Sequence, residues 1–395
     1  MRSKPSASTT LLQVVFSTTL SVLPVYLLGA LAVQIRADLQ LGPAELGIGA
    51  ALLYAVTGIL SRPSGVVVQK RGTTWGIVVA GMLATVSLLG VGLAPSLPLM
   101  YAALVLGGIG NALAQPAANL GVSSVVGSNR LGLAFGIKHT AIPAAGLLAG
   151  LAVPGIAVTL GWRWVLIIAA SASVALVLWA ALTRAETHAL SISDTSEADR
   201  GTPRDGLVVI TIGAGLASAA ATSLGVFMVD SAVTSGMTPT FAGLLFAASA
   251  SLGLVVRIVL GAAMDQHSGR SPYLLVANLL LGGTAGFLLL AFGGGIWFVA
   301  GSLIAYGSGW AWPGILHFAV VRDNRRAAAS ATGVLQTGVS LGGAVGPLAF
   351  GFLTQATSYD TSWMVVATVA AVAAVTFRVG RRMILHARRT FNPSP

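Results

Sequence analysis

Long apolar runs, separated by short turns and charged loops, make up most of the chain. A helix that crosses a bilayer needs about 20 apolar residues, and the pattern predicts twelve such spans. Their ranges are 10–33, 44–67, 75–93, 98–120, 132–156, 163–183, 206–229, 240–263, 272–292, 296–318, 329–353 and 362–381. No stretch alternates polar and apolar residues as a β-barrel strand does. The sequence therefore predicts an all-α membrane protein.

Two long stretches without Lys, Arg, Asp or Glu each require a turn in the middle. Gly72–Asn129 and Ser271–Val321 are both too long for a single spanning helix. Turn residues stand near the middle of each, at Ala94–Pro98 in the first and at Gly293–Gly295 in the second. Because Pro and Gly clusters interrupt helices, each stretch is expected to form two helices.

The chain also contains an internal repeat. Pro43 and Gly65 recur as Pro239 and Gly261, both 196 positions later. A further pair, Gly136 and Gly333, is separated by 197 positions. Between the two copies lies a polar segment of mixed charge, 184–205. We expect two six-helix bundles, 1–183 and 206–395, joined by this linker and related by an axis along the membrane normal.

Composition and charge agree with a membrane protein. Of the 395 residues, 55% are apolar and only 8% are charged, whereas soluble domains carry about 25% charged residues. The net charge of +11 comes from Lys and Arg on one set of alternate loops, with only Arg36 and Arg163 on the other. The positive-inside rule then predicts cytoplasmic termini, and no nucleic-acid partner is needed to explain the charge.

Other features narrow the setting of the protein. The first apolar run, Ser6–Ile35, is too long for a cleaved signal segment. The chain has no cysteine, which excludes disulfides and thiolate metal sites, and we expect neither a metal nor a cofactor. Abundant Ala and Gly suggest a bacterial source. We therefore expect a multi-pass protein of the bacterial inner membrane, a bilayer as its surroundings, and a functional monomer.

Two loops carry motifs typical of a known family. After the second span the chain reads Gly65–Gly72, GVVVQKRG, and after the eighth it reads Gly261–Arg270, GAAMDQHSGR. Together they resemble the signature of the major facilitator superfamily, in which a Gly precedes an Asp-Arg pair, a Gly and further basic residues. The resemblance implies a twelve-helix transporter that works by alternating access. It also implies gating roles for the loop residues Gly65, Gln69, Gly72, Asp265 and Arg270.

The chain departs from the family pattern in three places. Gln69 replaces the acid of the first loop, while the second loop keeps Asp265. The arginine that the family carries on its fourth helix falls at Leu104, and the antiporter motif of the fifth helix is absent. A carboxylate is favourable at a helix start, so Asp265 should hold the start of the fifth span. We therefore expect two unequal inner gates. The missing fourth-helix arginine and the missing antiporter motif argue against a proton-coupled drug exporter.

Three basic residues lie within predicted spans at similar depth: Arg62, Lys138 and Arg257. A charge at the bilayer centre costs at least about 2.5–3.5 kcal/mol, so such residues usually face a cavity or a partner. Arg62 and Arg257 come from opposite halves, and their placement resembles that of the arginines that grip the anion in the nitrate/nitrite porter branch. The three residues are therefore predicted to bind a small inorganic or carboxylate anion. Alternatively, they reach the interface or bind carbonyls at helix ends.

Several other residues are candidates for contact with the solute or lie near the ends of spans. Four polar or aromatic residues could line the solute cavity: Asn111, Gln115, Tyr306 and Trp310. By position, Asp230 is interpreted as a solvated helix end and His317 as an interfacial residue. No convergent set of catalytic groups indicates an enzyme. The alternative function is a drug or metabolite efflux transporter, which would be favoured by a membrane acid.

Overall fold

The computed structural model describes residues 7–125, 131–183, 204–266, 271–324 and 328–391, all of them in helices or the turns between them. The first half contains α1 (Ala7–Ala30), α2 (Ala32–Leu39), α3 (Pro43–Arg71), α4 (Thr73–Leu93), α5 (Leu97–Val125), α6 (Leu131–His139), α7 (Ala141–Ala152), η2 (Val153–Ala157), α8 (Val158–Leu160) and α9 (Trp162–Thr183). The second half contains α10 (Arg204–Thr234), α11 (Pro239–Gln266), α12 (Pro272–Ala291), α13 (Gly295–Ile304), η3 (Ala305–Gly309), α14 (Trp312–Asp323), α15 (Ala328–Ala356) and α16 (Tyr359–Phe391).

The fold is the predicted pair of six-helix bundles. Within the described ranges, eleven helical stretches are long and apolar enough to cross a membrane. The twelfth span, expected at 296–318, is present as the consecutive segments α13, η3 and α14, each too short to count alone. Both expected turns are present as well. The second one runs through Gly293, Gly294 and Gly295 at φ values of +66°, +62° and +59°, a region that glycine enters without steric cost.

Two spans are interrupted near their middle. The fifth span breaks at Thr140, between α6 and α7, and the tenth breaks at Trp310 and Ala311 after the π-helical turn η3. Proline follows each break, as Pro143 and Pro313. Since proline has no N–H, Pro143 cannot bond the carbonyl of His139 four residues earlier. The sequence thus produces a free carbonyl inside the membrane.

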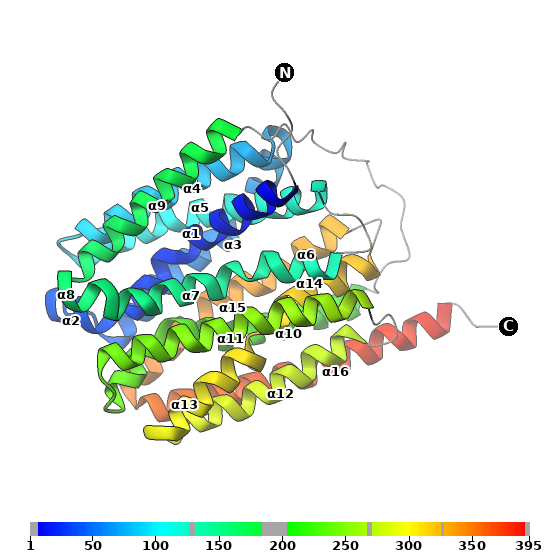
Figure 1. Cartoon of the computed structure of the whole chain (residues 1–395). Coiled ribbons are helices and arrows are strands. Elements are labelled where there is room, and N and C mark those ends of the chain that lie inside the picture. The colour runs from blue at the N-terminus through cyan, green and yellow to red at the C-terminus, as the bar shows by residue number, and fades with distance from the viewer. Residues whose placement is uncertain (1–6, 126–130, 184–203, 267–270, 325–327, 392–395) are drawn as a thin grey trace.

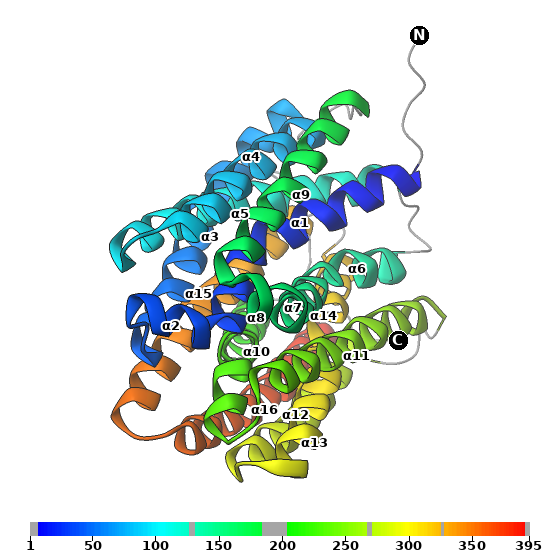
Figure 2. The same cartoon turned by 60° about the vertical axis from the view of Figure 1, so that its left-hand side comes forward.

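The two halves lie side by side (Figures 1 and 2). Five helices make most of the contact between them: α3 packs along α15, and α6 and α7 pack along α11. We call the side where α1 begins and α16 ends the termini side, and the other the far side. In Figure 1 the termini side is on the right and the loop helix α2 is on the left.

Glycines bring the halves into close contact toward the far side. A Cβ on Gly47 of α3 would stand 2.5 Å from the carbonyl oxygen of Pro347 of α15. Likewise, a Cβ on Gly150 of α7 would stand 2.6 Å from the backbone of α11 at Ala247. Small residues allow such backbone approach between membrane helices, so both helix pairs are closed on this side.

On the termini side the two pairs differ. Gly261 of α11 faces Gly136 of α6, and a Cβ on Gly261 would stand 3.1 Å from the Cα of Gly136. Their repeat counterparts are Gly65 of α3 and Gly333 of α15. Outside their own helices, no described residue has an atom within 4 Å of a Cβ position at either glycine. The α6–α11 pair is therefore closed on the termini side, whereas space remains beside both glycines of the α3–α15 pair.

Candidate functional site: buried cations between the halves

Two of the three predicted basic residues are buried near the helix breaks. Lys138 lies at the end of α6 and Arg257 lies in α11, and each residue is 3% exposed. The guanidinium of Arg257 donates to the carbonyl of His139, the residue after Lys138. The structure therefore brings together one cation from each half of the chain.

Arg257 is held by the carbonyls that the helix breaks release. Its Nε donates to the Trp310 carbonyl at 3.1 Å, and Nη2 donates to the same oxygen. Nη1 donates to the carbonyl of His139, which Pro143 leaves without a helical partner. In this conformation Arg257 therefore has the alternative role given above, because it binds carbonyls at helix ends. These acceptors are neutral, so the positive charge of Arg257 is not compensated by them.

Lys138 is held by a chain of neutral polar groups. Its Nζ donates to Oε1 of Gln115 at 2.9 Å. Nε2 of Gln115 donates to Oδ1 of Asn111 at 3.2 Å, and Nδ2 of Asn111 donates to the hydroxyl of Thr57 at 3.2 Å. Among the described residues, no carboxylate lies within ion-pair distance of Lys138 or Arg257.

Aromatic rings from both halves surround the Arg257 side chain. The rings of Tyr26 in α1 and Trp310 are stacked with centroids 5.9 Å apart, and Tyr306 in η3 lies 5.0 Å from Trp310. The Arg257 guanidinium carbon is 5.8 Å from the Trp310 ring centroid, within the range of a cation–π contact. π-Helical turns such as η3 are frequent at functional sites.

Unused hydrogen-bonding atoms gather at the same level. The buried atoms without a hydrogen-bond partner among the described residues include the Tyr306 hydroxyl, Nε2 of His139 and Nε1 of Trp312. His139 also lies 4.6 Å from His317, measured between ring centroids. His317 is buried and bonds the Pro313 carbonyl through Nδ1 at 2.8 Å. The interpretation of His317 as an interfacial residue is therefore wrong, because its side chain is enclosed by the protein.

Arg62 does not join this cluster. It is exposed on α3, one turn from the open space at Gly65. Of the other residues expected at this gate, Gln69 is half-buried and Gly72 ends α3 with φ of +90°. Arg270 lies outside the described residues.

Asp265 lies at the start of the fifth span. Its Oδ1 accepts from the backbone N–H of Gly132 and its Oδ2 from that of Leu133, both at 2.8 Å. These donors belong to the first turn of α6, where the helix has no acceptors of its own and its dipole is positive. The carboxylate therefore connects α11 of the second half to α6 of the first.

The interpretation of Asp230 as a solvated helix end is wrong. It is 1% exposed, and its Oδ2 accepts from Nη2 of Arg36 at 2.7 Å and from the Tyr359 hydroxyl. Partial burial acts to lower the pKa of Arg36, but Asp230 and Tyr359 together outweigh it and raise that pKa. The sequence could not reveal this pair, because Arg36 and Asp230 are 194 positions apart.

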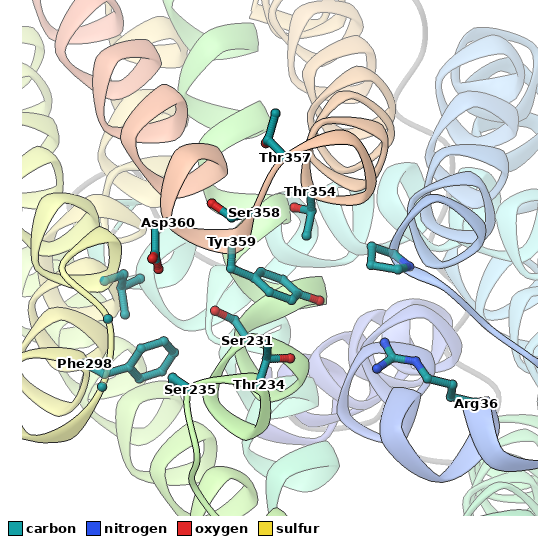
Figure 3. A pocket seen from close by; sticks show the side chains of 14 residues that line it. Arg36, Ser231, Thr234, Ser235, Phe298, Thr354, Thr357, Ser358, Tyr359 and Asp360 are labelled. Atoms are coloured by element: carbon teal, nitrogen blue, oxygen red, sulfur yellow. The ribbon is translucent and has the colours of Figure 1, made fainter.

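A cavity of about 570 Å³ opens on the far side beside this pair. Its walls include Arg36 and Tyr359, together with Asp360 and several hydroxyl residues of α10 and α15. Figure 3 shows the Tyr359 ring across the cavity, with its hydroxyl toward the side from which Arg36 enters. This cavity is separate from the buried cations, which lie deeper between the halves.

Comparison with known proteins gives a consistent picture. The sequence profile described as Major Facilitator Superfamily matches residues 14–324 and 210–390. No curated protein sequence matches the chain. Among solved structures, a bacterial homolog of the human lysosomal transporter Spinster, inward-facing and unoccupied, has a TM-score of 0.73 at 17% identity. That match covers 97% of this chain and 98% of the other.

Two further structures are similar. The same Spinster homolog in an occupied inward-facing conformation has a TM-score of 0.70 at 18% identity, with 97% and 98% of the two chains covered. A mutant of the nucleoside transporter NupG has a TM-score of 0.73 at 15% identity, with 94% and 99% covered. At these identities the likeness establishes the fold, and it leaves the solute open.

Proposed function

Because the chain belongs to the Major Facilitator Superfamily, we propose that it is a secondary transporter that carries a small inorganic or carboxylate anion by alternating access. The observation that supports an anion is the pair of buried cations, Lys138 and Arg257, with no carboxylate near either in the described chain. A buried charge without a counter-charge is costly. A bound anion would supply that counter-charge.

The neighbouring groups favour the same class of solute. The Tyr306 hydroxyl, His139 and Trp312 hold buried polar atoms without partners, and the tyrosine and tryptophan atoms can donate. An anion with several oxygens can accept from many donors at once. The Arg257 guanidinium adds a planar set of donors that suits a carboxylate or nitrate. Such an anion would have to take donors away from the carbonyls of His139 and Trp310.

A second candidate is an efflux transporter for a drug or metabolite of the same superfamily. The aromatic rings of Tyr26, Tyr306 and Trp310 favour it, since they offer an apolar surface to a flat solute. A cationic drug is disfavoured beside two buried cations. If the solute is an anion, we propose that the chain is related to the nitrate/nitrite porter branch.

We also propose an orientation and a division of the chain. The termini side would face the cytoplasm of a bacterial inner membrane, since Lys and Arg concentrate there. The bundles would extend over 1–183 and 206–395, with 184–205 as the linker. Each bundle carries one of the two cations, so a monomer would contain a complete site.

The test is ligand-induced thermal stabilisation of the purified protein with nitrate, phosphate, acetate, uridine and tetraphenylphosphonium, followed by uptake into proteoliposomes. We expect at least one anion to stabilise the protein and to be transported. Lys138→Gln should weaken the binding of that anion by about 10- to 100-fold, because a charged hydrogen bond contributes about 1.5–3 kcal/mol.

The matched control is Arg378→Gln. Arg378 is exposed on α16 and bonds Asn278, so the same loss of charge should leave anion binding unchanged. Stabilisation by uridine or tetraphenylphosphonium, with no response to any anion, would contradict the anion proposal and favour the efflux reading.

A further inference from the structure

Asp230 is the most deeply buried carboxylate of the described residues, at 1% exposure. Only one of its two oxygens is satisfied. Oδ2 accepts from Arg36 and Tyr359, whereas Oδ1 is buried and has no hydrogen-bond partner in the part of the chain that the structure describes. A carboxylate that is buried and incompletely bonded is held in its charged form mainly by its counter-charge.

That counter-charge comes from the other half of the chain. Arg36 belongs to α2, which follows the first span, while Asp230 belongs to α10 and Tyr359 to α16. The Arg36–Asp230 pair therefore ties the two halves together on the far side. Any conformation that separates the halves there must pull Arg36 away, and Asp230 would then be left as a buried unpaired charge.

Solvent can reach this pair from the far side. Arg36 and Tyr359 line the cavity of about 570 Å³, and the Arg36 side chain is 41% exposed. Figure 3 shows both residues projecting into this space. A proton from the far side can therefore arrive beside the carboxylate.

We propose that Asp230 is a proton-binding site that controls opening of the far side. It is ionised and paired with Arg36 in the closed state, and it is protonated when the halves separate there. This inference rests on the proposed transport function, since it assigns the outer gate of that cycle. A metal cation does not fit, because the Arg36 guanidinium lies 2.7 Å from Oδ2 and would repel it.

Other titratable groups of the far side are placed differently. Asp360 lines the same cavity from α16 and is exposed. The carboxylate of Glu45 in α3 lies beside Gly42, and Asp38 pairs with Arg163 at 3.6 Å. α15, which also packs on α10, has no acid, Lys, Arg, His or Tyr in its range. None of the three acids is hydrogen-bonded to Asp230 in the described structure.

The test uses distances across the far side as a function of pH. The chain has no cysteine, so Ala37→Cys in α2 and Gln355→Cys in α15, both at exposed positions, give one spin-label pair without background. Pulsed electron-spin measurements in lipid nanodiscs from pH 8 to pH 5 report the distance. We expect the population with the longer distance to grow at least fivefold as the pH falls.

Variants assign the response to a residue. Asp230→Asn should hold the longer distance at every pH, because an amide cannot ionise. Tyr359→Phe should keep the response and increase the population with the longer distance at pH 8, because the closed state loses the hydrogen bond from Tyr359 to Asp230. Asp360→Asn is the matched control in the same cavity, and its response should be that of the unmodified protein.

A pH-independent distance in the unmodified protein, or an unchanged pH response in Asp230→Asn, would overturn the proposal. A response that sodium produces at constant pH and that requires Asp230 would overturn it as well. No solute is added in this experiment, so its result stands apart from the anion panel that tests the proposed function.

Discussion

Under the proposed function, the Arg257 side chain would serve two functions. Its guanidinium satisfies the carbonyls of His139 and Trp310, which the helix breaks leave without partners. The charge remains available to a solute because both acceptors are neutral. A bound anion would compete with these carbonyls for the same N–H groups. At the scale of the residue, binding and helix geometry are therefore linked.

Arg257→Lys separates charge from geometry. The ammonium keeps the positive charge, but it lacks the planar fork that serves both carbonyls. We expect anion transport to fall at least tenfold. A buried carbonyl without a donor costs about 1–3 kcal/mol, so thermal stability in detergent should also decrease. Proteoliposome uptake and a thermal unfolding curve measure the two effects, with Arg378→Lys as the control. Uptake equal to that of the unmodified protein would show that the fork is dispensable.

At the scale of the element, the fifth span behaves as two helices. α7 packs both on α1 of its own half and on α11 of the other half, whereas α6 packs mainly on α11 and α14 of the other half. Beyond the break at Thr140 the contact with α1 is largely lost, and Asp265 holds α6 against α11 by accepting from the backbone N–H groups of Gly132 and Leu133. α6, which is the part of the fifth span on the termini side, is thus attached to the opposite bundle.

Pro143→Ala should weaken this arrangement. Alanine restores the N–H that can bond the His139 carbonyl, so a continuous helix would compete with Arg257 for that oxygen. We expect α6 to move away from α11, which spin labels on exposed positions of the two helices would detect as a longer distance. Pro24→Ala is the control, since α1 is continuous through Pro24. An unchanged distance would mean that Pro143 does not determine the break.

The sequence predicted the spans better than their interruptions. The apolar runs were enough to predict twelve spans, because a span depends on a local pattern. The repeated loop glycines were enough to predict two similar bundles, because these depend on repeat symmetry. Pro143 and Pro313 were available as signals of the breaks. Proline also occurs in the uninterrupted helices α1 and α3, so the residue alone does not decide. The burial of Asp230 and His317 depends on partners distant in sequence.

At the scale of the whole molecule, the repeat is symmetric but the conformation is not. Gly136 and Gly261 touch on the termini side, while their repeat counterparts Gly333 and Gly65 have open space beside them. The two loops differ in the same sense, because Asp265 provides a carboxylate where Gln69 provides only an amide. A charge at a helix start contributes about 0.3–1 kcal/mol, and up to about 2 kcal/mol when partly buried. That difference is enough to make one pair close more firmly than the other.

Repeat symmetry predicts how the open pair closes. When α3 and α15 approach on the termini side, Gly65 and Gly333 should meet as Gly261 and Gly136 do here, since each pair occupies equivalent positions. The chain has no cysteine, so Gly65→Cys with Gly333→Cys can report this contact by disulfide formation, which needs Cα atoms about 4.4–6.8 Å apart. We expect little cross-linking in the conformation described here and efficient cross-linking once the termini side closes. In contrast, Gly136→Cys with Gly261→Cys should weaken the closed α6–α11 contact, because a Cβ would stand 2.9 Å from the Arg257 carbonyl oxygen at Gly136 and 2.7 Å from the Gly132 carbonyl oxygen at Gly261. Adding Gln69→Asp should increase cross-linking of the first pair several-fold, because the new carboxylate favours the closed arrangement against the start of α15. If Gln69→Asp has no effect, or if the cysteines at positions 65 and 333 cross-link efficiently from the start, then the missing acid does not explain the open space at Gly65.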